Sequence, residues 1–240
     1  MSKFKAVFKR YEKKYIATDE QRNRLVEKML EHMTPDEYGQ STICNIYFDT
    51  PDFRLIRTSI EKPVFKEKLR IRSYGVPDSD SSVFVELKKK YKGIVYKRRV
   101  RMSYTDAVMY LVKGRRPDGV NEQVLNEIDY FVSVYPHLRP AVSLFYDRTA
   151  YYGKTDRDLR ITFDRNIRFR NRKIDLSLGC DGCPILDSDK SIMEIKCNGS
   201  MPLWLTKELD RMQIYPVSFS KYGNAYQYIV QSPSKTAANI

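Results

Sequence analysis

Charged residues recur at every second position in several short segments that have the composition of β-strands. Side chains two residues apart on a strand point to the same face, so each segment presents one charged face and one largely apolar face. One such strand is typical of an ordinary solvated sheet. Recurrence over several mostly basic segments indicates a sheet curled around a polyanion. The clearest segments are 70–72, 86–88, 97–101, 160–164 and 194–196.

The charged faces combine many cations with a few carboxylates, a combination that suits a metal-bound triphosphate. Arginine offers a planar fork that matches phosphate oxygens, and lysine offers a point charge. Carboxylates hold hard divalent cations, which usually keep waters and substrate phosphates as their other ligands. The basic residues on these faces are Lys14, Arg70, Arg72, Lys88, Lys97, Arg99, Arg148 and Arg160. The acidic ones are Glu12, Glu86, Asp164 and Glu194.

Any one of these segments also fits a plain solvated face. Arg160 and Asp164 are compatible with a cross-turn salt bridge. Glu86 and Lys88 are compatible with an exposed pair that contributes little to stability. It is the recurrence over many strands that favours the polyanion interpretation.

The elements that must position these residues are mostly strands joined by hairpin-length connections, with helices inserted between pairs. This order predicts an α+β fold, an antiparallel β-barrel tunnel of about eight strands with helices packed outside. Without a repeat or linker, we expect a single domain over 1–240 with its core at about 4–230, and a frayed tail from Ser232. The expected strands are 4–16, 43–48, 64–74, 83–90, 94–102, 141–152, 159–163, 166–170 and 191–197. The expected helices are 19–33, a short one ending near Ile60, 105–114, 121–135, 203–211 and 219–230.

Composition points to an anionic partner. Lys and Arg number 43 and Asp and Glu 30, an excess of 43 − 30 = 13 positive charges. The sequence shows neither a signal peptide nor an apolar run near the roughly 18 residues that a spanning helix needs. We therefore expect a cytoplasmic protein, with attachment to a membrane protein left open.

The four cysteines and two histidines limit the other chemistries. Cys180 and Cys183 form a lone CxxC pair, and the second pair that a zinc site would want is missing. An ordinary turn with two free thiols is the favoured interpretation. With His32 and His137 isolated, a histidine base or triad is disfavoured.

Eight short motifs occur in order and together resemble the VTC domain, the polyphosphate polymerase branch of the triphosphate tunnel metalloenzymes (the CYTH superfamily). The resemblance spans roughly 4–230 and implies a β-barrel tunnel that moves the terminal phosphate of ATP onto a growing polyphosphate chain, with Mn or Mg bound. The motifs lie at 10–15, 47–50, 68–72, 86–88, 148–151, 159–164, 193–196 and 220–222.

The resemblance also implies roles for individual residues. Ser220 would add a hydroxyl donor, Tyr146 would lie near the nucleotide, and Glu194 would hold the metal. Arg10 stands where the hydrolases of the superfamily have the first Glu of an E-x-E-x-K motif, which favours a polymerase over a triphosphatase. The phosphate-contacting catalytic residues would be Arg70, Arg72, Arg148, Arg160 and Lys221. The substrate-binding lysines would be Lys14, Lys88 and Lys97.

Two alternatives remain open at this level. The same fold could use water or a ribose hydroxyl as acceptor, which would make the protein a triphosphatase or a nucleotidyl cyclase. The domain could also bind polyphosphate or single-stranded RNA without turnover. Nucleic acid is not the expected partner, because the sequence has no RNP or helix-turn-helix motif and the charged faces carry acids.

Overall fold

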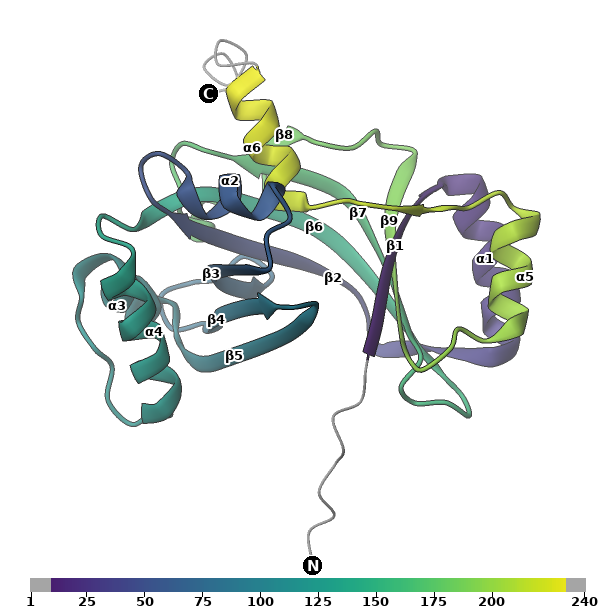
Figure 1. The fold of residues 1–240 in the computed structure, drawn as a ribbon, viewed down its shortest axis with the longest axis horizontal. Helices are drawn as coiled ribbons and strands as arrows, with labels where there is room; N and C mark the ends of the chain where they lie inside the picture. Colours follow the sequence, from purple (N-terminus) through teal and green to yellow (C-terminus); the bar gives the residue numbers. More distant parts are fainter. Residues whose placement is uncertain (1–9, 232–240) are drawn as a thin grey trace, which may run out of the picture. The chain divides into compact units, whose positions relative to one another are not determined.

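A computed structural model describes residues 10–231, and the side chains from residue 12 onward (Figure 1). Residues 4–9 of the first expected strand, the side chain of Arg10 and the tail from Ser232 lie outside this description. The elements are β1 (Arg10–Thr18), α1 (Asp19–His32), β2 (Met33–Asp49), α2 (Arg54–Ile60), β3 (Phe65–Tyr74), β4 (Ser82–Tyr91), β5 (Ile94–Ser103), α3 (Tyr104–Lys113), α4 (Glu122–Val134), β6 (Arg139–Gly153), β7 (Arg160–Arg170), η1 (Leu176–Leu178), β8 (Cys183–Pro184), β9 (Lys190–Asn198), α5 (Leu203–Arg211), β10 (Pro216–Val217) and α6 (Lys221–Gln231).

The strands form an antiparallel sheet, and the α+β class is confirmed. The described pairing follows the order β10-β1-β9-β7-β6-β2-β3-β4-β5, and β8 pairs with β7. The sheet has ten strands, where about eight were expected, and β10 and β5 lie at the two ends of the order, so the described pairing does not close the expected barrel. The strands that were not expected are β8 and β10, each of two residues and too short to show an alternation. The expected strand 43–48 is also longer than predicted, because most of residues 33–42 are not buried and show no apolar alternation. Among residues 10–231, no helix is both long and apolar enough to cross a membrane.

The chain divides into two compact units that alternate along the sequence. Of the described residues, the first unit contains 10–41, 147–166 and 186–219, and the second contains 42–146, 167–185 and 220–231. Each unit has its own hydrophobic core. The single domain expected from the sequence stays a prediction.

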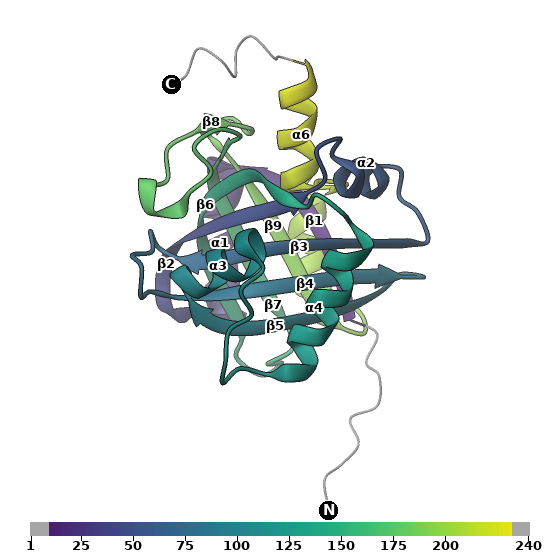
Figure 2. The same cartoon turned by 90° about the vertical axis from the view of Figure 1, so that its left-hand side faces the viewer.

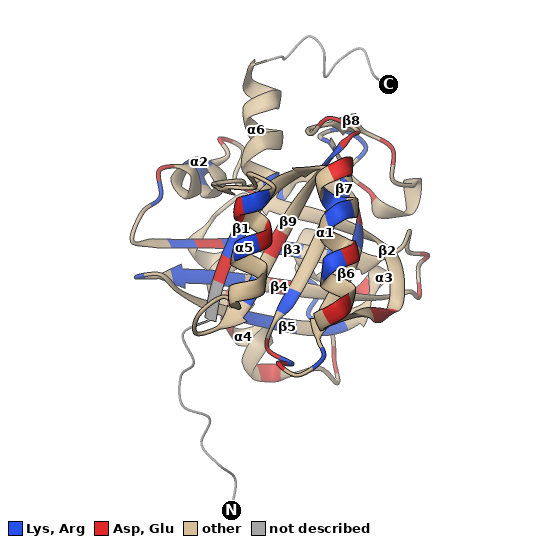
Figure 3. Cartoon of the chain, turned by 90° about the vertical axis from the view of Figure 1, so that its right-hand side faces the viewer, with Lys and Arg blue, Asp and Glu red and all other residues tan. Residues whose placement is uncertain are grey.

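The first unit places α1 and α5 on the apolar face of β1, β9 and β7. Tyr15, Met193 and Phe163 are paired across these three strands and are buried together. Helix α1 begins at a capping box, in which the Gln21 backbone N–H donates to Thr18 Oγ1 at 3.2 Å and the Thr18 N–H donates to Gln21 Oε1 at 3.0 Å. Both α1 and α5 carry acidic and basic residues (Figure 3). Their amphipathic pattern therefore leaves one face for the core and one for water.

The second unit packs α3 and α4 against one face of β2, β3, β4 and β5 (Figure 2). Ile46, Ile71, Val85 and Val100 stand directly opposite one another across these strands and are all buried. Since side chains alternate along a strand, the residues between them project to the opposite face. That opposite face carries most of the charges of β3, β4 and β5.

Candidate functional site

The charged face of the second unit is built from cross-strand rows of basic residues. Lys68, Lys88 and Lys97 are direct partners on β3, β4 and β5. A neighbouring row pairs Arg70 with Glu86, which in turn pairs with Arg99. We call this surface the basic face and define it as Lys66, Lys68, Arg70, Arg72, Lys88, Lys90, Lys97, Arg99 and Arg101, with Glu86 among them. On these three strands Glu86 is the one acid that this face carries.

Glu86 is the electrostatic centre of the basic face. Its side chain is only 2% exposed, and its Oε2 accepts from Arg70 Nε at 2.7 Å and lies 2.6 Å from Arg70 Nη2. Lys97 Nζ lies 2.5 Å from its Oε1, and Arg72 Nε lies 3.8 Å from Oε2. Burial raises the pKa of Glu86, but Arg70, Arg72 and Lys97 outweigh burial and lower this pKa to about 2. The carboxylate therefore stays ionised and holds three cations in place.

These contacts overturn one of the sequence interpretations. The exposed pair of Glu86 with Lys88 is wrong, because Glu86 is buried whereas Lys88 is exposed. The neighbouring strands β3 and β5, which the linear sequence does not identify, supply the partners of Glu86.

Neutral side chains orient the two arginines of the basic face. Arg70 Nη1 donates to the Tyr47 hydroxyl at 2.8 Å. Arg72 Nε donates to Asn45 Oδ1 at 3.0 Å, and its Nη2 donates to the Tyr146 hydroxyl at 3.1 Å. Burial raises the pKa of Tyr47, but the positive charges of Arg70, Lys68 and Arg72 bring it down to about 8. The two guanidinium groups are thus fixed before any ligand arrives.

The start of α6 lies against the same face. Tyr222 stacks on Tyr47 with ring centroids 4.7 Å apart, and its hydroxyl donates to Asp49 Oδ2 at 2.8 Å. Burial of the Tyr222 phenol raises its pKa, and the Asp49 carboxylate raises it further. Ser220 Oγ accepts from the Gly223 N–H at 3.1 Å, so it caps α6.

Two lysines adjoin this helix start. Lys68 Nζ lies 3.4 Å from Ser220 Oγ as a hydrogen-bond donor. Lys221 Nζ lies 4.7 Å from the centroid of the Tyr146 ring. The α6 start therefore brings Ser220, Lys221 and Tyr146 next to the basic face, within one unit.

In the first unit, two of the predicted arginines have different environments. Arg148 makes a bidentate pair with Asp164, from Nε at 2.6 Å and from Nη2 at 2.8 Å, and Asp164 is fully buried. Arg160 lies over the Tyr152 ring at 5.0 Å, and its buried Nε makes no hydrogen bond to the described residues. The cross-turn pair of Arg160 with Asp164 is therefore wrong, because Arg148 on β6 takes that carboxylate.

The predicted metal ligand lies on the charged face of β1, β9 and β7. Lys14 stands opposite Glu194, and Glu12 stands opposite Lys196. Lys196 Nζ lies 2.5 Å from Glu194 Oε1 and 4.0 Å from Glu12 Oε2. Lys14 Nζ also donates to the Phe219 carbonyl at 3.0 Å.

Two carboxylates that share a lysine fit a divalent ion completed by water and substrate phosphates. Glu194 and Glu12 are both accessible, with side chains 11% and 33% exposed. The described side chains contain no group of three or more His, Cys, Asp or Glu residues arranged to hold a metal ion. Any ion at Glu194 would therefore depend on water and substrate phosphates for part of its coordination.

The predicted site residues thus form one set in each unit. Lys68, Tyr47, Asn45 and Lys196 were not among the predicted site residues. Lys68 could have been found, since it continues the alternation of Arg70 and Arg72. Asn45 and Tyr47 lie in an uncharged segment that offers no such signal. The second unit holds Arg70, Arg72, Lys88, Lys97, Tyr146, Ser220 and Lys221. The first holds Lys14, Arg148, Arg160 and Glu194.

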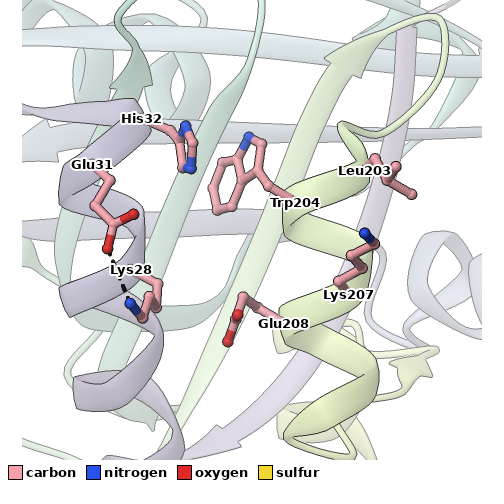
Figure 4. A pocket seen from close by; sticks show the side chains of 7 residues that line it. All are labelled: Lys28, Glu31, His32, Leu203, Trp204, Lys207 and Glu208. Carbon is pink, nitrogen blue, oxygen red and sulfur yellow. Dashed lines mark hydrogen bonds and ion pairs between the residues drawn. The ribbon is translucent and has the colours of Figure 1, made fainter.

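Two other features lie away from these sets. A pocket of about 340 Å³ opens between α1 and α5, where His32 stacks on Trp204 at 4.4 Å and Lys28 pairs with Glu31 (Figure 4). Its lining includes none of the predicted site residues. In the second unit, Cys44 Sγ and Cys180 Sγ lie 3.2 Å apart.

Comparison with known proteins supports the resemblance seen in the sequence. A model of the VTC domain matches residues 9–230. Subunit 4 of the vacuolar transporter chaperone complex of Schizosaccharomyces pombe is 28% identical over 148 residues, which are 53% of this chain and 20% of that protein. The present chain thus matches about one fifth of that relative's length.

The solved structures of two other proteins are similar to this chain. A candidate adenylate cyclase of Bacillus halodurans has a TM-score of 0.55 at 17% identity, covering 87% of this chain and 92% of that one. A candidate adenylyl cyclase from Hippeastrum, described with a dominant triphosphatase activity, has a TM-score of 0.49 at 14% identity, covering 92% of this chain and 95% of that one. At this identity, the similarity to the Bacillus protein shows a shared fold.

Proposed function

Because this chain belongs to the VTC domain family, we propose that it is a polyphosphate polymerase, which transfers the terminal phosphate of ATP to a growing polyphosphate chain. The observation that carries the proposal is the basic face, where rows of lysine and arginine surround one buried carboxylate. Such a surface binds an extended anion at many points and leaves little for a neutral ligand. The relative from Schizosaccharomyces pombe, a subunit of a vacuolar transporter chaperone complex, also supports this proposal.

In phosphoryl transfer the protein contributes mainly by positioning the reactants and stabilising charge, and less by forming covalent bonds. A terminal oxygen of the polyphosphate chain attacks the γ-phosphorus of ATP in line. The bond from that phosphorus to the bridging oxygen breaks, and ADP leaves with the electron pair. No protein base is required, since the attacking phosphate is already ionised, and neither His32 nor His137 is part of the basic face.

In the second unit we assign the fixed guanidinium groups of Arg70 and Arg72 to the phosphates of the nucleotide. Lys88 and Lys97 continue the row of cations and would hold the polyphosphate chain. Lys221 and Ser220, beside Tyr146, would contact the nucleotide phosphates from the start of α6.

In the first unit we assign Lys14, Arg148 and Arg160 to phosphate oxygens. The buried Nε–H of Arg160 donates no hydrogen bond to the described residues, so it could donate one to a phosphate oxygen of the substrate. Glu194, with Glu12, would hold Mn or Mg, which when bound neutralises part of the phosphate charge.

The test is purified protein incubated with ATP and Mn or Mg, with chain length read on a gel and the product checked with an exopolyphosphatase. We expect a ladder of polyphosphate. Arg70→Ala should lower the rate of polyphosphate synthesis by about 10³-fold, the low end for an arginine that stabilises phosphoryl transfer. Lys88→Ala should lower the rate, whereas Lys113→Ala, an exposed lysine of α3, serves as the matched control and should not.

Three results would contradict the proposed activity, and a fourth would contradict the roles of the first-unit residues. Free phosphate without polymer would indicate a triphosphatase, and cyclic nucleotide would indicate a cyclase. Salt-dependent binding of polyphosphate or RNA without ATP consumption would indicate a binding module. Unchanged polymerisation by both Arg148→Ala and Glu194→Ala would contradict the roles assigned to the first-unit residues.

A further inference from the structure

The hairpin between β4 and β5 ends in an uncovered apolar cluster. Lys92 and Gly93 form its tight turn, with φ values of 46° and 85°, which suits the right-handed twist of the two strands. Next to the turn, Phe65, Tyr91 and Ile94 stand directly opposite one another on β3, β4 and β5. Figure 2 shows this end of the strands extending beyond α4.

The cluster lies on the same side of the sheet as the core but outside the cover of the helices. Leu69 and Leu87, also on that side, are fully buried. Phe65, Tyr91 and Ile94 are 45%, 45% and 49% exposed. Exposed Tyr96 lies on the same side, whereas exposed Val95 pairs with Lys90 and projects from the basic face, and exposed Val64 precedes Phe65 in the chain. We call these six residues the hairpin tip, namely Val64, Phe65, Tyr91, Ile94, Val95 and Tyr96.

Lysines surround the hairpin tip. Residues 88–99 contain no Asp or Glu, and Lys or Arg occupies positions 88, 89, 90, 92, 97, 98 and 99. Lys90 and Lys92 are exposed at the end of the hairpin, and Lys90 projects from the face opposite to Tyr91. The tip is therefore amphipathic, with apolar side chains bordered by positive charge.

We propose that the hairpin tip is a docking surface for an anionic lipid bilayer. In this arrangement Ile94 and its apolar neighbours enter the boundary between headgroups and acyl chains, while Lys90 and Lys92 reach the lipid phosphates. Tyrosine suits this depth, because its ring is apolar and its hydroxyl is polar. This inference is independent of the proposed catalytic activity.

The residue types favour a bilayer over a soluble polyanion. Polyphosphate would use the lysines but gain nothing from Ile94, Val95 or Phe65. Single-stranded nucleic acid could stack bases on Tyr91 and Tyr96, but the aliphatic side chains offer no stacking surface. A bilayer uses both the charge and the apolar area.

The test is co-sedimentation of the full chain with vesicles, without ATP. One set contains equal parts of phosphatidylserine and phosphatidylcholine, and the other contains phosphatidylcholine alone. We expect binding to the anionic vesicles and little to the neutral ones. Ile94→Ser should weaken binding by about tenfold, and Lys90→Glu should weaken it by about fivefold or more.

Matched controls separate docking from folding. Val112→Ser removes an apolar residue of similar exposure on α3, and Lys113→Glu reverses an exposed lysine, so both should bind as the parent does. Far-ultraviolet circular dichroism and urea midpoints should be unchanged in all four variants.

The proposal is overturned if the parent does not bind anionic vesicles, or binds neutral ones equally well. It is also overturned if Lys90→Glu weakens binding but Ile94→Ser does not, since the surface would then attract any polyanion. Concentration-dependent self-association that Ile94→Ser abolishes, without vesicle binding, would assign the tip to a second copy of the chain.

Discussion

Replacing Glu86 by glutamine should destabilise the protein at neutral pH. The substitution keeps the size of the side chain and removes the negative charge among Arg70, Arg72 and Lys97. Without the Glu86 carboxylate, the positive charges of Arg70, Arg72 and Lys97 stay close together with no negative charge between them, which is costly in a buried site. The loss should therefore exceed that of an ordinary surface pair.

The magnitude follows from the pKa of Glu86, which falls from an ordinary 4.5 to about 2 in the folded protein. Each pKa unit corresponds to 1.36 kcal/mol, so the ionised carboxylate contributes about 3 kcal/mol at neutral pH. A depressed folded pKa means that this contribution is complete above about pH 5 and is lost as the pH falls toward 2. At about pH 3, roughly 2 kcal/mol of it should be gone.

Urea unfolding of the parent and Glu86→Gln, at neutral pH and at about pH 3, measures this difference. We expect a gap of about 3 kcal/mol that narrows to about 1 kcal/mol in acid. Glu122→Gln is the control, since Glu122 forms an exposed pair with Arg116 and should cost under about 1 kcal/mol. A gap that is small, or that does not change with pH, would refute the central role of Glu86.

Three further predictions concern other buried groups. The Tyr47 phenol, with a pKa of about 8, should ionise at a lower pH than ordinary tyrosines, so it should add stability as the pH rises from about 8 to 10. Phenolate absorbance that appears near pH 8 in the parent and is missing in Tyr47→Phe would verify this ionisation. Arg148→Met should cost about 3 kcal/mol by removing both of its hydrogen bonds to Asp164, and adding Asp164→Asn should recover part of the loss in urea unfolding. Cys44 and Cys180, with sulfurs 3.2 Å apart, should be linked by a mild disulfide reagent, seen as the loss of two titratable thiols.

Much of the architecture was readable from local periodicity. Alternating charge identified the strands that carry the basic face, and Arg70 and Arg72 were correctly placed on one face of one strand. The Thr18 signal located the start of α1. Such features depend on residues close together in the chain, so a single sequence contains them.

Pairing and burial depended on the tertiary structure. Glu86 and Asp164 looked like ordinary strand acids, but Arg70, Arg72, Lys97 and Arg148 come from other strands to surround them. The division into two cores and the exposure of Ile94 also depend on which elements become neighbours. The face to which a side chain points is set by its own strand, whereas its partners and its access to water are set by strands and helices that are remote in sequence.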